Sequence, residues 1–161
     1  MSDQNKLMTK QLLDGWNGQL NRASKLFNEL TEEQIQREVA PGRNTGTYLL
    51  GHLVAVHDAL FPLLGVGEKL YPPLEEVFIK NPDKSGLEKP SVKELKNYWD
   101  EVNKELENHF NKFTVDQWLQ KHTAVSEEDF VKEPHRNRLN VLISRTNHLA
   151  YHIGQLAFLK N

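Results

Sequence analysis

The chain has 161 residues, of which 38% are hydrophobic and 26% are charged, and its net charge is −2. These values are typical of one globular domain spanning residues 1–161, and the absence of a basic stripe interleaved with aromatic residues argues against a nucleic-acid binder. The chain contains no cysteine, which excludes disulfides, a protein thiol nucleophile and cysteine-based zinc sites.

The N-terminal stretch MSDQNKLMTKQLLDGW has neither an apolar signal core nor a small-residue cleavage site. No run of apolar residues approaches the roughly 18 needed to span a bilayer. We therefore expect a cytoplasmic protein that does not engage a membrane.

Apolar residues at steps of three and four predict a first helix from about Lys6 to Glu29. A short helix should follow, because Thr31 and Gln34 have the spacing of a capping box. The segment APGRNTG then interrupts the chain. The second long helix is expected to begin near Asn44 or Thr45 and to end at Gly65, with Pro62 near its end.

The segment from Val66 to Pro90 is rich in Pro, Gly, Asn and Asp, and a connection of this length is usually functional or poorly ordered. The third helix opens at Ser91, where Glu94 completes a second capping box. Helical turns are expected in FTVDQW and in TAVSEEDFVKEPHRN, before a fourth long helix from Arg138 to Lys160. No segment has strand periodicity. The pattern predicts an all-α four-helix bundle with a long loop between its second and third helices.

Four of the seven histidines lie on two of the predicted long helices. His148 and His152 are one turn apart, so they point the same way. His52 and His57 are five residues apart, or about 140° around the helix, and cannot easily bind one metal together. Both belong to apolar rows, so periodicity does not choose between them. The other three histidines are at a helix end or in polar loops and are interpreted as bystanders: His109, His122 and His135.

A pair of histidines at i and i+4, joined by one histidine from a facing helix, would bind a divalent ion on one side and leave the other side open. Such an ion lowers the pKa of a bound water or thiol. Gly154 could permit close approach of a helix or ligand, and Gln155 or Arg145 could contact a ligand or support a metal-binding histidine. Half-buried core histidines would give the same pattern.

The stretches GHLVAVHDAL and NHLAYHIGQLAFLK resemble the DinB-like superfamily, which includes the YfiT-type metal-dependent hydrolases. The resemblance covers nearly the whole chain: four long helices, PGRNTGTYLLGHL entering the second, a long loop, and His-x-x-x-His-x-Gly-Gln closing the last. It implies a four-helix bundle of unusual helix order and a metal site formed by His52, His148 and His152. It also implies nickel, zinc or another divalent ion, and leaves His57 as a structural or cavity-lining neighbour.

The resemblance implies a hydrolase, or an enzyme that transfers a low-molecular-weight thiol such as bacillithiol or mycothiol onto an electrophile. The thiol would come from a cosubstrate, because the chain has no cysteine. The resemblance identifies no general base, because the three histidines of the family's site are all metal ligands. The candidates in this chain are His57, Asp58 and Glu75. The resemblance also suggests a homodimer.

The alternative is a non-catalytic helical module for stress response or dimerisation, with a structural metal or none. A structural site would recruit a fourth protein ligand such as His57 or Asp58, whereas an enzyme would leave a position free. Four arginines could favour an anionic cosubstrate, and a solvated surface explains them equally well: Arg43, Arg136, Arg138 and Arg145.

Overall fold

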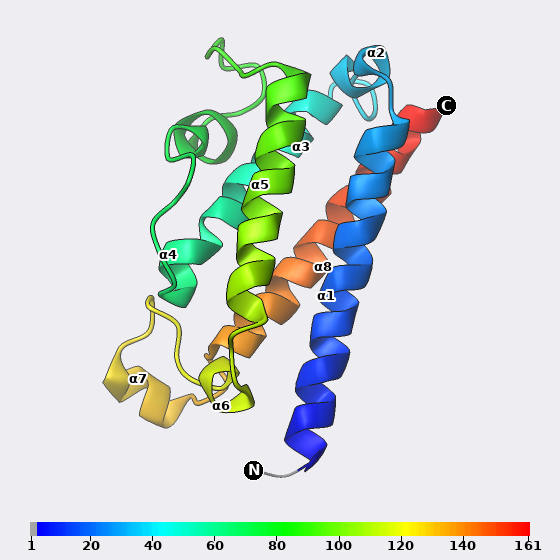
Figure 1. The fold of residues 1–161 in the computed structure, drawn as a ribbon. Helices are drawn as coiled ribbons and strands as arrows, with labels where there is room; N and C mark the ends of the chain where they lie inside the picture. Colours follow the sequence, from blue (N-terminus) through cyan, green and yellow to red (C-terminus); the bar gives the residue numbers. More distant parts are fainter. Residues whose placement is uncertain (1–2) are drawn as a thin grey trace.

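The computed structural model describes residues 3–161, and over that range all its regular elements are helices (Figure 1). This confirms the all-α prediction. The four longest helices are α1 (Asp3–Glu29), α3 (Gly46–Asp58), α5 (Val92–Phe110) and α8 (Arg138–Leu156). The shorter elements are α2 (Glu32–Gln36), α4 (Leu60–Leu64), the π-helix η1 (Glu76–Lys80), α6 (Val115–Trp118), α7 (Glu127–Lys132) and the 3-10 helix η2 (Ala157–Lys160).

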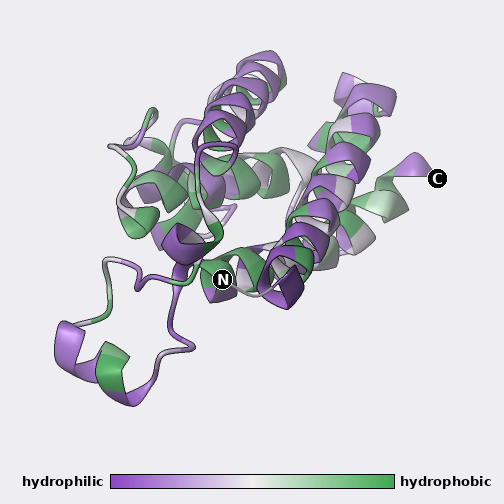
Figure 2. Cartoon of the chain, turned by 60° about the horizontal axis from the view of Figure 1, so that its bottom comes forward, coloured by the Kyte–Doolittle hydropathy of each residue, from purple (hydrophilic) through white to green (hydrophobic). Residues whose placement is uncertain are grey.

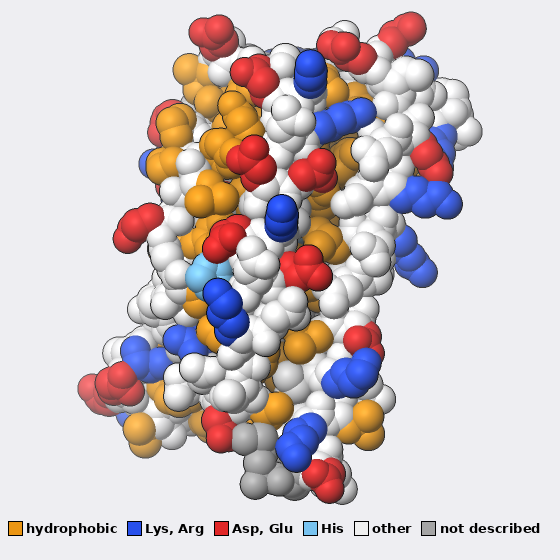
Figure 3. Space-filling model, viewed as in Figure 1, with side chains coloured by type: hydrophobic (Ala, Val, Ile, Leu, Met, Phe, Trp, Pro, Cys, Tyr) orange, Lys and Arg blue, Asp and Glu red, His pale blue; other side chains and the backbone are white. Residues whose placement is uncertain are grey.

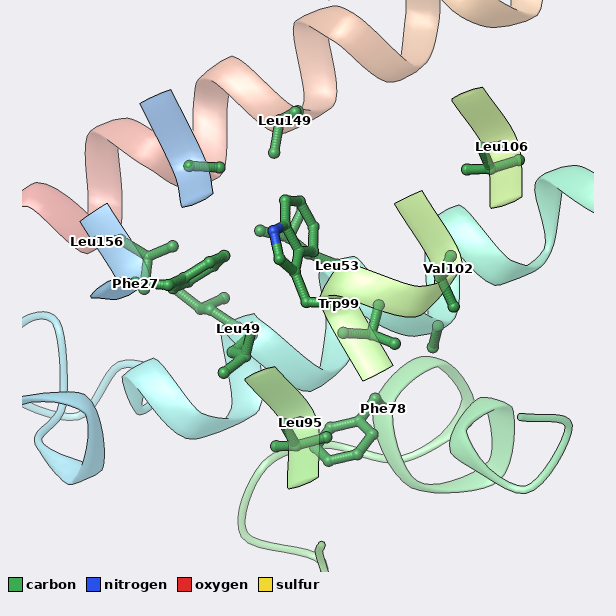
Figure 4. Close-up of a cluster of buried hydrophobic side chains, with 14 of the residues drawn as sticks. Phe27, Leu49, Leu53, Phe78, Leu95, Trp99, Val102, Leu106, Leu149 and Leu156 are labelled. Carbon is green, nitrogen blue, oxygen red and sulfur yellow. The ribbon is translucent and has the colours of Figure 1, made fainter. Parts of the chain in front are cut away.

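The long helices pack as two pairs, α1 along α8 and α3 along α5, and α3 also contacts α8. In Figure 1, α1 and α5 lie in front, with α3 and α8 crossing behind them. The apolar faces point inward and the polar faces outward (Figure 2). Large side chains from all four helices fill the core, including Phe27, Leu49, Trp99 and Leu149 (Figure 4). The face over α1 and α5 carries charges of both signs (Figure 3).

The predicted helix starts are confirmed by their caps. Thr31 and Gln34 form a capping box on α2, and Ser91 and Glu94 form another on α5. The side chain of Thr45 accepts a hydrogen bond from the backbone N–H of Tyr48 and caps α3. Side chains in these positions satisfy N–H groups that have no partner in the first helical turn.

The second long helix spans the predicted range, from Gly46 to Leu64, with an interruption of one residue at Ala59, whose backbone keeps right-handed helical dihedral angles. α3 ends at Asp58, and α4 begins at Leu60. Pro62 is the cause, because proline has no N–H and its ring clashes with the carbonyl four residues earlier, which here belongs to Asp58. Gly65, at φ 68°, then closes α4 in the left-handed conformation that glycine adopts most readily.

The long connection between α4 and α5 is tied to α3. The carboxylate of Asp58 accepts hydrogen bonds from the backbone N–H groups of Leu70, at 2.7 Å, and Tyr71, at 2.9 Å. Further along, the ring of Phe78 is fully buried in the core. Two points on the segment therefore hold it against the helices.

By length and composition alone, the stretch Gly46–Leu64 could cross a membrane, which differs from the expectation of no such stretch. The fold buries 72% of it, and the core helix of a soluble protein passes the same test.

Candidate metal centre

Three histidine side chains from α3 and α8 converge on one point. Nε2 of His148 lies 3.2 Å from Nε2 of His52 and 3.1 Å from Nε2 of His152. Two nitrogens bound to one tetrahedral ion at about 2.05 Å would be about 3.3 Å apart, so these distances match a shared ion closely. We call His52, His148 and His152 the histidine cluster. Its geometry is compatible with a divalent metal.

The ring of His52 is oriented by the segment after α4. Its Nδ1 lies 2.8 Å from the carbonyl oxygen of Phe78. A carbonyl can only accept, so Nδ1 carries the proton and the lone pair of Nε2 faces the cluster. Metal-binding histidines are commonly held in this way by a partner on the far nitrogen.

Gly51 makes room for that contact. A Cβ atom at this position would lie 2.4 Å from two carbons of the Phe78 ring, so only glycine lets the ring pack directly on α3. The glycine before His52 therefore allows the carbonyl of Phe78 to reach the histidine. Sequence reasoning missed both residues, because nothing in the spacing shows where a loop carbonyl will lie.

The ring of His152 is oriented from its own helix. Its Nδ1 lies 2.7 Å from the side-chain oxygen of Gln155, one turn further along α8. Gln155 in turn donates from its amide nitrogen to the hydroxyl of Tyr151 at 3.4 Å. The Gln155 oxygen thus fixes the proton on Nδ1 of His152 and leaves the lone pair of Nε2 facing the other two histidines.

Burial keeps the two histidines of α8 neutral. It lowers the pKa of His148 to about 4, and the neighbouring His152 and His52 lower it further. Burial also lowers the pKa of His152, although its hydrogen bond to Gln155 opposes the shift. A metal binds neutral imidazole, so these rings are already in the binding form near neutral pH.

His57 lies in the core, outside the cluster. Its ring is fully buried, with ring centroids 4.9 Å from Trp16 and 5.0 Å from Trp99. Its Nδ1 lies 2.7 Å from the side-chain oxygen of Asn103, whose amide nitrogen donates to the carbonyl of Trp99. Burial lowers the pKa of His57 to about 3.

The other residues that the sequence suggested for the site do not join the histidine cluster. Asp58 holds the loop, and Glu75 pairs with Lys69 and Lys80. Arg145 lies one turn before His148 and is half-buried. Gly154 does not support a close approach, because a Cβ there would meet nothing within 4 Å. Within residues 3–161, the histidine cluster therefore gains no acid and no fourth histidine.

A hollow of about 370 Å³ adjoins the cluster at Gln155. It lies between the segment before α3 and the last turns of α8, and its lining residues are Val39, Ala40, Arg43, Tyr151, Gln155 and Phe158. Gln155 also bonds to His152, so its side chain lies between this hollow and the cluster.

Comparison with known proteins gives one family match. The model of the DinB superfamily matches residues 16–156, a range that includes all three histidines of the cluster. No curated protein matches the chain. The family match covers most of the sequence, and the motifs that suggested it lie on the two helices that carry the cluster. The chain therefore belongs to the DinB superfamily.

Proposed function

We propose that the protein is a metal-dependent enzyme that transfers a low-molecular-weight thiol onto a small electrophile, with His52, His148 and His152 holding one nickel or zinc ion. The observation that carries the proposal is the convergence of three Nε2 atoms, two of whose rings are oriented by oxygen acceptors on Nδ1. A divalent ion in this position would act as a Lewis acid and lower the pKa of a thiol or water that it binds.

The number of protein ligands in the cluster favours a catalytic site. A structural zinc site has four protein ligands, whereas a catalytic site keeps one position for solvent or substrate. The two residues that could have supplied a fourth ligand are engaged elsewhere, since His57 is bonded to Asn103 and Asp58 to the loop. Within the described part of the chain, the cluster comprises three ligands only.

The positions of the candidate bases favour thiol transfer over hydrolysis. A thiol has a pKa of about 8.5 and water of about 15.7, so a thiol needs far less help to lose its proton. His57 is buried in the core, Asp58 accepts two backbone hydrogen bonds, and Glu75 is paired with two lysines. None of these three side chains is free to take a proton from water at the cluster.

The chain's own residues have defined tasks in this proposal. Phe78 and Gln155 keep the protons of His52 and His152 on Nδ1, so both rings present a lone pair. The thiol comes from a cosubstrate, because the chain contains no cysteine.

The test is a thiol-consumption assay on nickel-loaded and zinc-loaded protein, with monobromobimane as the electrophile and cysteine as the thiol. We expect metal-dependent product formation above the uncatalysed rate, lost in His148→Ala and retained in the matched control His135→Ala, whose histidine is exposed in a loop. Ester hydrolysis without thiol transfer would support the hydrolase alternative. Equal rates with His148→Ala and wild type would contradict a role for the cluster.

The second candidate is a non-catalytic dimerisation module. It is favoured by two large aromatic side chains on α8 and η2, Tyr151 and Phe158, which are 63% and 68% exposed. A second copy of the chain could cover them. A homodimer that binds metal without any thiol or ester chemistry would support this reading.

A further inference from the structure

We propose that the guanidinium of Arg145 is an anion-binding position beside the histidine cluster, so that the thiol taken by this site also carries a carboxylate. This inference rests on the proposed function and narrows its cosubstrate to small thiol acids.

Arg145 is a half-buried cation without a protein partner. Its Nε atom is enclosed by the protein and has no acceptor, and no described residue gives its side chain a hydrogen bond or an ion pair. Three of the other five arginines are engaged: Arg37 donates to the carbonyls of Leu159 and Asn161, Arg136 pairs with Glu133, and Arg138 donates to the carbonyl of Gln117. The remaining two, Arg22 and Arg43, are exposed to solvent, so their charges stay hydrated.

The end of the Arg145 side chain can still reach a ligand. Of its three nitrogens only Nε is both enclosed and unpartnered, so the two terminal nitrogens face space that solvent can enter. A guanidinium binds a carboxylate through these terminal nitrogens, in a planar two-point contact.

The positive charge around Arg145 and the histidine cluster is not balanced by an acidic side chain of the cluster. Burial lowers the pKa of the Arg145 guanidinium, which shows that part of its hydration is lost. A divalent ion would add two positive charges, and among residues 3–161 no acid joins the three histidines. Half-buried positive charge without a counter-charge is costly, so an anionic ligand stabilises the site.

The spacing sets the size of the ligand. Arg145 and His148 are three residues apart on α8, and such residues are neighbours whose Cβ atoms lie about 5–6 Å apart. A ligand that meets both the guanidinium and an ion held by the cluster therefore needs its thiol and its carboxylate close together, on a chain of a few carbons.

The experiment compares two thiols that differ only in charge. 3-Mercaptopropionate and 3-mercapto-1-propanol are titrated into cobalt-loaded protein, and binding is followed by the change in the visible spectrum. We expect the acid to bind wild type at least about tenfold more tightly than the alcohol, as a charge-assisted contact provides. In Arg145→Gln the acid and the alcohol should bind about equally tightly, while the cobalt content and the affinity for the alcohol are unchanged.

Arg43→Gln is the matched control, because it removes the same charge from the exposed arginine that lines the hollow. It should keep the preference for the acid. A preference that is absent from wild type, that survives in Arg145→Gln, or that is lost in Arg43→Gln instead would overturn the inference. In those cases cobalt and both thiols still bind, so the proposed function stands. Protein that takes up no cobalt overturns both proposals.

Discussion

The contact between Gly51 and Phe78 gives the most specific prediction, because it links the fold to the cluster. In Gly51→Ala the new Cβ would lie 2.4 Å from the Phe78 ring, which is fully buried and has no open side. Overpacking of this kind lowers the stability of a protein by about 1–3 kcal/mol. We take the upper end of this range because the new Cβ would clash with several atoms of the Phe78 ring at once. The gain from placing alanine in a helix is about 1 kcal/mol. The net loss of stability should be about 2 kcal/mol.

For a chain of this size a loss of about 2 kcal/mol lowers Tm by roughly 4–8 °C. The displaced ring also moves the carbonyl that orients His52, so metal affinity should fall about 10–100-fold. Thermal unfolding of the metal-free protein and competition with a chelator measure the two effects. The matched control is Gly154→Ala, where the Cβ meets nothing within 4 Å. It should raise stability by up to about 1 kcal/mol and leave metal affinity unchanged. Equal stability and equal metal affinity in the two variants would show that the Phe78 ring does not depend on the missing side chain at Gly51.

Three further predictions follow from single contacts. Gln155→Leu removes the acceptor on His152 and should weaken metal binding about 10–100-fold with little change in Tm, as measured by chelator competition; unchanged affinity would contradict this role. Asp58→Ala leaves two loop N–H groups without their acceptor and should cost about 2 kcal/mol in urea unfolding, with faster proteolysis within residues 66–90. Since burial lowers the pKa of His57 to about 3, from 6.5 in the unfolded chain, only the unfolded state binds this proton near pH 5. Stability should therefore fall between pH 7 and pH 5, by about 2 kcal/mol from this residue. Urea unfolding of His57→Gln should show a correspondingly smaller loss of stability between pH 7 and pH 5. A loss identical to that of wild type would argue against a buried neutral histidine.

The sequence predicted most of the helices, since their signals are local. Thr31 with Gln34 and Ser91 with Glu94 have cap spacings that the structure reproduces as capping boxes. The end of the second helix at Gly65 was also predicted, whereas the one-residue interruption at Ala59 was not, because the effect of Pro62 falls four residues earlier, on the carbonyl of Asp58.

The site was less accessible to sequence reasoning, because it depends on contacts between distant segments. Apolar periodicity could not choose between His52 and His57, and the family resemblance pointed to His52. The structure places His52 beside His148 and buries His57 against Trp99. The Phe78 carbonyl lies 26 residues from His52 and carries no signal in the sequence. Gly154 looked like a point of close approach and faces open space instead.

Elemental analysis of tag-free protein, wild type beside His148→Ala, measures whether the histidine cluster holds a metal ion. His148 is the member of the cluster that lies within 3.2 Å of both other Nε2 atoms, so its loss should empty the site. We expect close to one nickel or zinc ion per wild-type chain and almost none in His148→Ala, with His135→Ala matching wild type. Wild-type protein that holds no metal and takes up neither nickel nor zinc when they are added would contradict this expectation.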